Sequence, residues 1–358
     1  SKAKIYKEPG AGDIAAILQN NLECFSTFGA GIFTEQQIKE AVTGSERILA
    51  GISRLLHQRK RNGKVRHCHG DLHLANIVLI DGKPILFDAI EFDDALATID
   101  VIYDLSFLVM DLAFQGLVVE ANILLNRYIT LSLDFEGLAP LPLFLFMRSS
   151  IRAHVAALNK DRIKAKNYMG FALNCLKQIS PKLIAIGGLS GSGKSSLARL
   201  IAPNLTPLPG AILLRSDIIR KQLLGIDQYA KLTEQAYSPE ITRKTYDEIY
   251  KRATIALKAG YSVIADAVFS APDERQAIQN VGIHTGMQFK GIWLETDPTI
   301  ASARILNREN DASDATPDVL NRQLDYDVGI MNWSAFDSSM SLERLSQEIF
   351  KRIQINDD

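Results

Sequence analysis

Apolar positions recur at helical spacing through most of the first half of the chain. Six segments there combine this spacing with few helix breakers and are predicted to be helices: 13–26, 35–60, 99–115, 118–132, 141–158 and 162–178. One strand pair is expected in this half, because the runs NIVLI and PILFD flank an Asp81-Gly82 turn.

The pattern changes near Ile179-Ser180-Pro181. From Lys182 onward, short β-rich runs alternate with helical segments; the runs are LIAIGG, AILLRS, YSVIADA and FKGIWLE. This alternation is typical of a parallel sheet with crossover helices. We therefore predict an α/β protein of two domains: a mostly helical domain over 1–180, and a parallel sheet flanked by helices over 181–358.

Composition narrows the class of protein. The chain has 358 residues, 47% hydrophobic and 23% charged, which excludes disorder as the main state. A net charge of −1 gives no bulk field for nucleic acid or an anionic membrane, so neither is expected as a partner. Three widely spaced cysteines without a CxxC pair favour a reducing cytoplasm, and no apolar run reaches the length of a spanning helix.

A glycine-rich motif opens the second domain. Gly188 to Ser195 fits G-x-x-x-x-G-K-[ST], between a β-rich run and a helix-forming run. Lys194 is expected to reach the β- and γ-phosphates of ATP, and the Ser195 hydroxyl to ligate Mg²⁺. A plain turn linking strand to helix is the alternative, which the complete pattern disfavours. The expected nucleotide-binding residues are Gly188, Ser190, Gly191, Ser192, Gly193, Lys194, Ser195 and Ser196.

Four further residues are candidates for catalysis in this domain. Asp217, at a strand-to-helix junction, is placed to accept the proton of an attacking hydroxyl, or it simply caps the helix. Asp266 ends another strand and suits a magnesium site; a turn acid is the alternative. Arg304 and Arg308 share a helix face before a polar loop and form either a phosphate lid or a solvated basic face. Arg275 is a weaker candidate for binding substrate, and a surface position is the expectation that is favoured.

Residues 183–340 resemble the small P-loop kinases that phosphorylate hydroxyls of small molecules, the group of gluconate kinase, chloramphenicol phosphotransferase and zeta-toxin-like kinases. The resemblance rests on GLSGSGKSS, on LRSDIIRK, on the strand ending at Asp266 and on the helix with Arg304 followed by DASDA. It implies that Asp217 positions the acceptor and that the lid arginines neutralise phosphate. The expected function is transfer of phosphate from ATP to a sugar, polyol or antibiotic-like hydroxyl. The alternative is an ATP-dependent sensor or regulator.

The stretch HCHGDLHLAN, residues 67–76, allows two kinds of site. A metal site would use His69 and His73, spaced four apart, with His67 or Cys68. That spacing requires a continuous helix, and Gly70 in the middle weakens it. The competing pattern is H-x-D-x-x-x-x-N, which is favoured.

In that second pattern, Asp71 is the candidate acceptor of a substrate proton, while Asn76 and Asp88 are candidate magnesium ligands at one end of the hairpin. HGDLHLANIVL, LFDAIEF and IDVIYDLSFLVMDL resemble the large helical lobe of the aminoglycoside phosphotransferase family over residues 10–160. Its fusion to a P-loop kinase resembles a bacterial group of bifunctional kinase-like proteins. The family's small β-rich lobe has no counterpart before His69. We therefore expect either that the chain is a fragment or that its helical lobe is a remnant serving another purpose. In both cases Asp71, Asn76 and Asp88 should be inert for phosphate transfer but able to bind substrate or metal.

Overall fold

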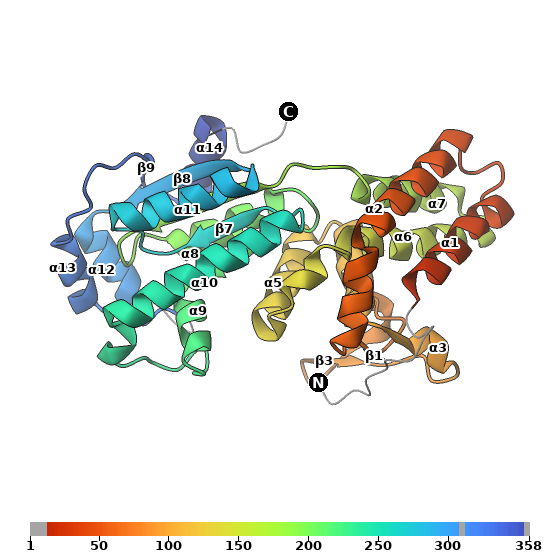
Figure 1. The fold of residues 1–358 in the computed structure, drawn as a ribbon, viewed down its shortest axis with the longest axis horizontal. Helices are drawn as coiled ribbons and strands as arrows, with labels where there is room; N and C mark the ends of the chain where they lie inside the picture. Colours follow the sequence, from red (N-terminus) through yellow and green to blue (C-terminus); the bar gives the residue numbers. More distant parts are fainter. Residues whose placement is uncertain (1–12, 308–311, 354–358) are drawn as a thin grey trace. The chain divides into compact units, whose positions relative to one another are not determined.

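The computed structural model describes residues 13–307 and 312–353 and divides into two compact units, Ser1–Gln178 and Ile179–Asp358 (Figure 1). Within these described ranges, no helix combines the length and the apolar character needed to cross a bilayer.

The first unit contains all six expected helices. They are α1 (Ile14–Phe28), α2 (Glu35–Arg61), α4 (Val101–Phe114), α5 (Val118–Ser132), α6 (Leu141–Leu158) and α7 (Arg162–Cys175). The expected hairpin is also present, formed by β2 (Ile77–Ile80) and β3 (Lys83–Leu86).

Five short elements of this unit were not expected, two of which are the 3-10 helices η1 (Leu74–Asn76) and η2 (Phe135–Leu138). β1 (Val65–His67) pairs antiparallel with β4 (Thr98–Asp100), and α3 (Asp94–Ala97) precedes β4. The prediction of a single strand pair was therefore wrong. The helix expected from residue 99 begins at Val101 instead, because Ile99 and Asp100 pair with β1.

A buried ion cluster fixes α2 in the first unit. Arg59 is fully buried; its Nε lies 2.8 Å from Asp100 Oδ2 and its Nη1 lies 2.7 Å from Asp134 Oδ1. Burial alone would raise the pKa of Asp134, but the hydrogen bonds and charge of Arg59 outweigh it and hold that pKa below its ordinary value. Residues far apart in sequence are thus tied together at the end of α2.

The second unit is built on five parallel strands in the order β6-β7-β5-β8-β9. The strands are β5 (Lys182–Gly188), β6 (Ile212–Arg215), β7 (Val263–Asp266), β8 (Gln288–Glu295) and β9 (Ser334–Asp337), of which only β9 was not expected. The helices are α8 (Lys194–Ile201), α9 (Ser216–Leu223), α10 (Pro239–Lys258), α11 (Pro272–Thr285), α12 (Pro298–Leu306), α13 (Pro317–Leu324) and α14 (Leu342–Ile353). The expected fold class is confirmed.

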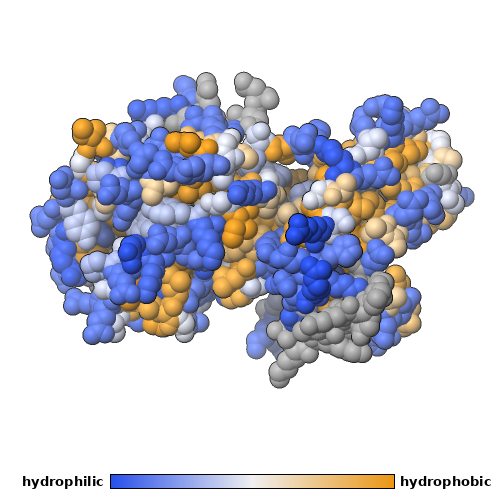
Figure 2. Space-filling view, in the orientation of Figure 1, coloured by the Kyte–Doolittle hydropathy of each residue, from blue (hydrophilic) through white to orange (hydrophobic). Residues whose placement is uncertain are grey.

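Helices cover both faces of this sheet. One apolar cluster joins Ile186 and Leu294 of the sheet to Leu197 of α8 and Ile349 of α14. Since side chains alternate along a strand, Trp293 points to the opposite face, where α11 contacts β8 and α10 contacts β6 and β7. On the side of this unit shown in Figure 2, polar residues predominate and apolar ones form small separate groups. The parallel strands all end at one edge of the sheet, and the candidate residues gather there.

Candidate active site

The phosphate loop connects β5 to α8 at the carboxyl edge of the sheet. Gly188, Gly191 and Gly193 have φ values of +141°, +80° and +88°, which favour glycine. A Cβ atom on Gly191 would lie 2.8 Å from the carbonyl carbon of Ala301 and closer still to its oxygen. The loop therefore requires glycine at position 191 both for its backbone angle and for its contact with α12.

The lysine, serine and aspartate expected at a nucleotide site lie around this loop. Lys194 begins α8, and its Nζ donates to the carbonyl oxygens of Gly188 and Leu189, both at 2.8 Å. The Ser195 hydroxyl donates to Asp266 Oδ2 at 2.5 Å. Hydroxyl and carboxylate oxygens are ligands that Mg²⁺ accepts, so this pair fits a magnesium site. The two residues are 71 positions apart in sequence and are brought together because β5 and β7 are neighbours.

Arg215 is a residue of this site that the sequence interpretation missed. Its Nε lies 3.5 Å from Asp266 Oδ2, and both side chains are largely buried. The sequence signal that could have found it is its place in AILLRSDIIRK, at the end of the β-rich run and directly before Ser216-Asp217. In the structure Arg215 ends β6 and is paired with the β7 residue Asp266 in the parallel register. The positive charge of Arg215 therefore faces the same carboxylate as the Ser195 hydroxyl.

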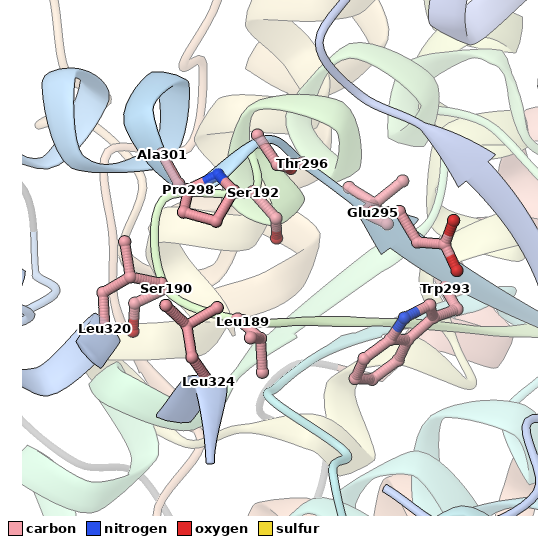
Figure 3. Close-up of a pocket in the computed structure, with 11 residues that line it drawn as sticks. Leu189, Ser190, Ser192, Trp293, Glu295, Thr296, Pro298, Ala301, Leu320 and Leu324 are labelled. Carbon is pink, nitrogen blue, oxygen red and sulfur yellow. The ribbon is translucent and has the colours of Figure 1, made fainter. Parts of the chain in front are cut away.

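The serines of the motif differ in their surroundings. Ser190 donates its backbone N–H to Gln323 Oε1 at 2.8 Å, so this amide is directed to α13. The carbonyl oxygen of Ser192, which is buried, accepts a 2.8 Å hydrogen bond from the Ser338 hydroxyl. Ser196 is exposed on the first turn of α8. A cavity lies against this loop, lined by Leu189, Ser190, Ser192, Trp293, Leu294, Glu295, Thr296, Pro298, Ala301, Leu320 and Leu324 (Figure 3).

Asp217 lies in the first turn of α9, close to the loop. Burial raises the pKa of its carboxyl, and the charge of Asp266 raises it further, while Arg215 and Lys194 act in the opposite direction. Its carboxylate also accepts a hydrogen bond from the hydroxyl of Ser313. The structure thus brings Asp217, Asp266 and Lys194 into one electrostatic group.

Arg304 is anchored on α12 beside the phosphate loop. Its Nη2 donates to the carbonyl oxygen of Ser338 at 2.8 Å, and its Nη1 lies 3.7 Å from where a Cβ of Gly193 would be. Arg308, the second expected lid arginine, lies outside the described residues.

The expectation for Arg275 was wrong. Its side chain is 2% exposed, and its guanidinium donates to the carbonyl oxygens of Phe269, Ser270, Val328 and Ile330. It ties the segment after β7 to the segment before β9, which makes it a structural residue.

In the first unit, the HCHGDLHLAN stretch forms a loop held by two helix residues. Asp104 of α4 accepts from the backbone N–H groups of His69 and Gly70 at 3.1 and 2.9 Å, and Asp111 of the same helix accepts from the backbone N–H of Leu74 at 3.0 Å. The sequence alone did not indicate either aspartate as a support for this loop.

The loop brings together two of the candidate residues of this unit. The Asn76 amide donates to the Asp71 carbonyl at 2.9 Å and to Asp71 Oδ2 at 3.2 Å. Asp88 follows the hairpin in a left-handed conformation with φ +60° and is exposed. Its neighbour Phe87 donates its N–H to the Asn76 carbonyl at 3.1 Å, so Asp88 and Asn76 lie at the same end of the hairpin.

The metal alternative for this stretch finds no support in the described part of the chain. Nowhere among those residues do three or more His, Cys, Asp or Glu side chains gather into the kind of site that this alternative needs. His69 Nε2 lies 2.9 Å from the Phe87 carbonyl oxygen, and His73 Nε2 lies 3.3 Å from Asp71 Oδ2. The two histidines thus have separate partners.

Comparisons with known proteins address mainly the second unit. A family model described as an AAA domain matches residues 183–327. The chain is 29% identical over 309 residues to uncharacterized proteins of Mycobacterium bovis and Mycobacterium tuberculosis, covering 82% of this chain and 60% of theirs. It therefore spans about 60% of the length of these curated relatives.

Among solved structures, the chain is similar to a gluconokinase from Sinorhizobium meliloti, with 21% identity and a TM-score of 0.33 over 47% of this chain and 89% of that one. It is also similar to the Mycobacterium tuberculosis APS kinase CysC in complex with AMPPNP and APS, with 18% identity and a TM-score of 0.34 over 49% and 98% of the two chains. The match over residues 183–327, with the glycine-rich loop between β5 and α8, makes the second unit a P-loop domain.

Proposed function

We propose that the second unit is an ATP-dependent kinase that transfers the γ-phosphoryl group to a hydroxyl of a small molecule. The observation that carries the proposal is the grouping of Lys194, the Ser195–Asp266 pair and Asp217 at one edge of the sheet. Ligands of open α/β sheets bind at this edge.

In this proposal, the phosphate loop and Lys194 bind the ATP phosphates. Lys194 now donates to two loop carbonyls, which keeps its ammonium group at the mouth of the loop. Ser195 and Asp266 hold Mg²⁺, which when bound supplies positive charge to the phosphate oxygens. Arg304, beside Gly193, adds a cationic side chain to the same region.

Asp217 is the residue that would orient the acceptor hydroxyl and take its proton. A carboxyl with a raised pKa is a better proton acceptor than an ordinary aspartate, provided that it is still ionised at the working pH. The Ser313 hydroxyl already donates to this carboxylate, which supports Asp217 as a site where a hydroxyl binds.

For the first unit we propose a phosphotransferase-type helical lobe that binds substrate or metal through Asp71, Asn76 and Asp88. The Asn76–Asp71 hydrogen bonds and the position of Asp88 at the same end of the hairpin support this.

The proposal for the second unit is tested by measuring ATP consumption with Mg²⁺ across a panel of sugars, polyols, aminoglycosides and nucleosides. Acceptor-stimulated turnover that is lost in Lys194→Ala and Asp217→Ala supports a kinase. Lys244→Ala, which removes an exposed lysine of α10, is the control for loss of charge and should retain turnover. ATP consumption that no acceptor changes, and that is lost in Lys194→Ala but not in Asp217→Ala, would instead favour a regulatory ATPase.

A further inference from the structure

The segment that precedes α13 brings a serine, Ser313, to Asp217, the residue proposed to orient the acceptor hydroxyl. Ser313 belongs to the short segment between α12 and α13, and its hydroxyl donates to the Asp217 carboxylate. Asp217 in turn lies close enough to Lys194 and Asp266 for their charges to act on it. A serine hydroxyl is therefore bound to the residue proposed to take a proton, and that residue lies within electrostatic reach of the residues proposed to hold ATP.

The segment around Ser313 is fixed in this place by its neighbour. Asp314 Oδ1 lies 3.1 Å from Nζ of Lys221, an ammonium group on α9 that is only 1% exposed. Asp314 Oδ2 accepts a 3.2 Å hydrogen bond from the Tyr237 hydroxyl. Ala312, on the other side of Ser313, is buried. A buried ammonium group that loses its carboxylate is costly, so these contacts favour the segment in its present position.

We propose that Ser313 is an internal phosphate acceptor, phosphorylated in cis by the ATP bound at the same P-loop when no small-molecule acceptor is present. This inference rests on the proposed kinase function. Ser313 Oγ would form a bond to the γ-phosphorus, and the bond from that phosphorus to the bridging oxygen would break. The electron pair leaves with ADP, and the Ser313 proton passes to Asp217.

The modification would change what the site accepts. A phosphoserine carries close to two negative charges at neutral pH and would stand beside the carboxylates of Asp217 and Asp314. The negative charges of the phosphate and of these neighbouring carboxylates repel each other, so the phosphorylated segment would move away from Asp217. An acceptor hydroxyl and Ser313 compete for the same carboxylate, so a true acceptor should suppress the labelling of Ser313.

The test uses the full chain with Mg²⁺ and ATP labelled at the γ-phosphate, followed by mass spectrometry of the tryptic peptide 309–322. Its only hydroxyl residues are Ser313 and Thr316, so fragmentation assigns the phosphate. We expect label on Ser313 at a rate per molecule that does not depend on protein concentration. Ser313→Ala should abolish it, Asp217→Asn should slow it at least ~100-fold, and Thr316→Ala should retain it. Asp314→Ala, which frees the segment from Lys221, should slow it about tenfold.

The outcomes separate the two proposals. Acceptor phosphorylation without phosphate on Ser313 overturns the inference and leaves the kinase function standing. Phosphate on Ser313 without transfer to any acceptor supports the inference and removes the proposed small-molecule function. Absence of both reactions overturns both, and a labelling rate per molecule that rises with protein concentration overturns the cis mechanism.

Discussion

Replacing Gly191 with alanine should lower the unfolding free energy of the second unit by more than the left-handed backbone angle at position 191 alone would cause. The left-handed conformation, φ +80°, costs a residue with a Cβ about 1–2 kcal/mol. The added Cβ would also press on the backbone carbonyl of Ala301, which cannot rotate away as a side chain tip can. Overpacking of this kind costs about 1–3 kcal/mol, so the total loss of unfolding free energy should be about 2–5 kcal/mol.

Gly225→Ala is the matched control for this substitution. Gly225 follows α9 with φ +67°, and a Cβ there would meet nothing within 4 Å, so only the backbone term of about 1–2 kcal/mol remains. Urea unfolding followed by tryptophan fluorescence reports on the second unit, because both tryptophans, Trp293 and Trp333, lie in it. With a slope of about 2 kcal/mol/M, Gly191→Ala should unfold about 0.5–1.5 M earlier than the control. Equal midpoints would refute the proposed contact between the loop and Ala301.

Three further predictions concern buried charges. Arg59→Met leaves two buried aspartates without their partner and should lower the unfolding free energy of the first unit by about 3–5 kcal/mol. The control Lys64→Met changes a side chain that is 29% exposed and should lower it by at most about 1 kcal/mol. Amide hydrogen exchange of α6 peptides measures both losses. Because the pKa of Asp134 is lowered by folding, its stabilising contribution is present above its ordinary pKa and is lost as the pH falls, so the same exchange should quicken in acid. Arg215 lowers the pKa of Asp217, so Arg215→Met should move the acid limb of the turnover-pH profile to higher pH; an unchanged limb would exclude Asp217 as the titrating group.

Local sequence was sufficient for most of the fold because helices and parallel strands depend on short-range patterns. The six helices of the first unit have apolar stripes that are visible along the chain, and the phosphate loop follows from a motif whose glycines are needed for its backbone angles. The strand β9 escaped prediction because SAFD is four residues long and contains no β-branched residue. Its place at the sheet edge depends on pairing with β8, which no local pattern encodes.

Long-range side-chain pairs were beyond the reach of the sequence. Ser313 and Asp217 are distant in the chain, and the segment that carries Ser313 lies near Asp217 because α12 and α13 both contact the phosphate loop. Arg275 was expected at the surface because most arginines are exposed. Its guanidinium instead donates to four backbone carbonyls. Because every residue has a backbone carbonyl, the sequence does not indicate which ones bind Arg275.

The most direct test of the central claim is the fate of the γ-phosphate. ATP labelled at that position is incubated with the full chain, Mg²⁺ and the acceptor panel, and the label is followed into the acceptor, Ser313 and inorganic phosphate. The account predicts label in a small-molecule phosphate ester, reduced about 10²–10⁴-fold by Asp217→Asn and lost with Lys194→Ala. Label that appears only as inorganic phosphate, at a rate that no acceptor and no change at Asp217 affects, would contradict it.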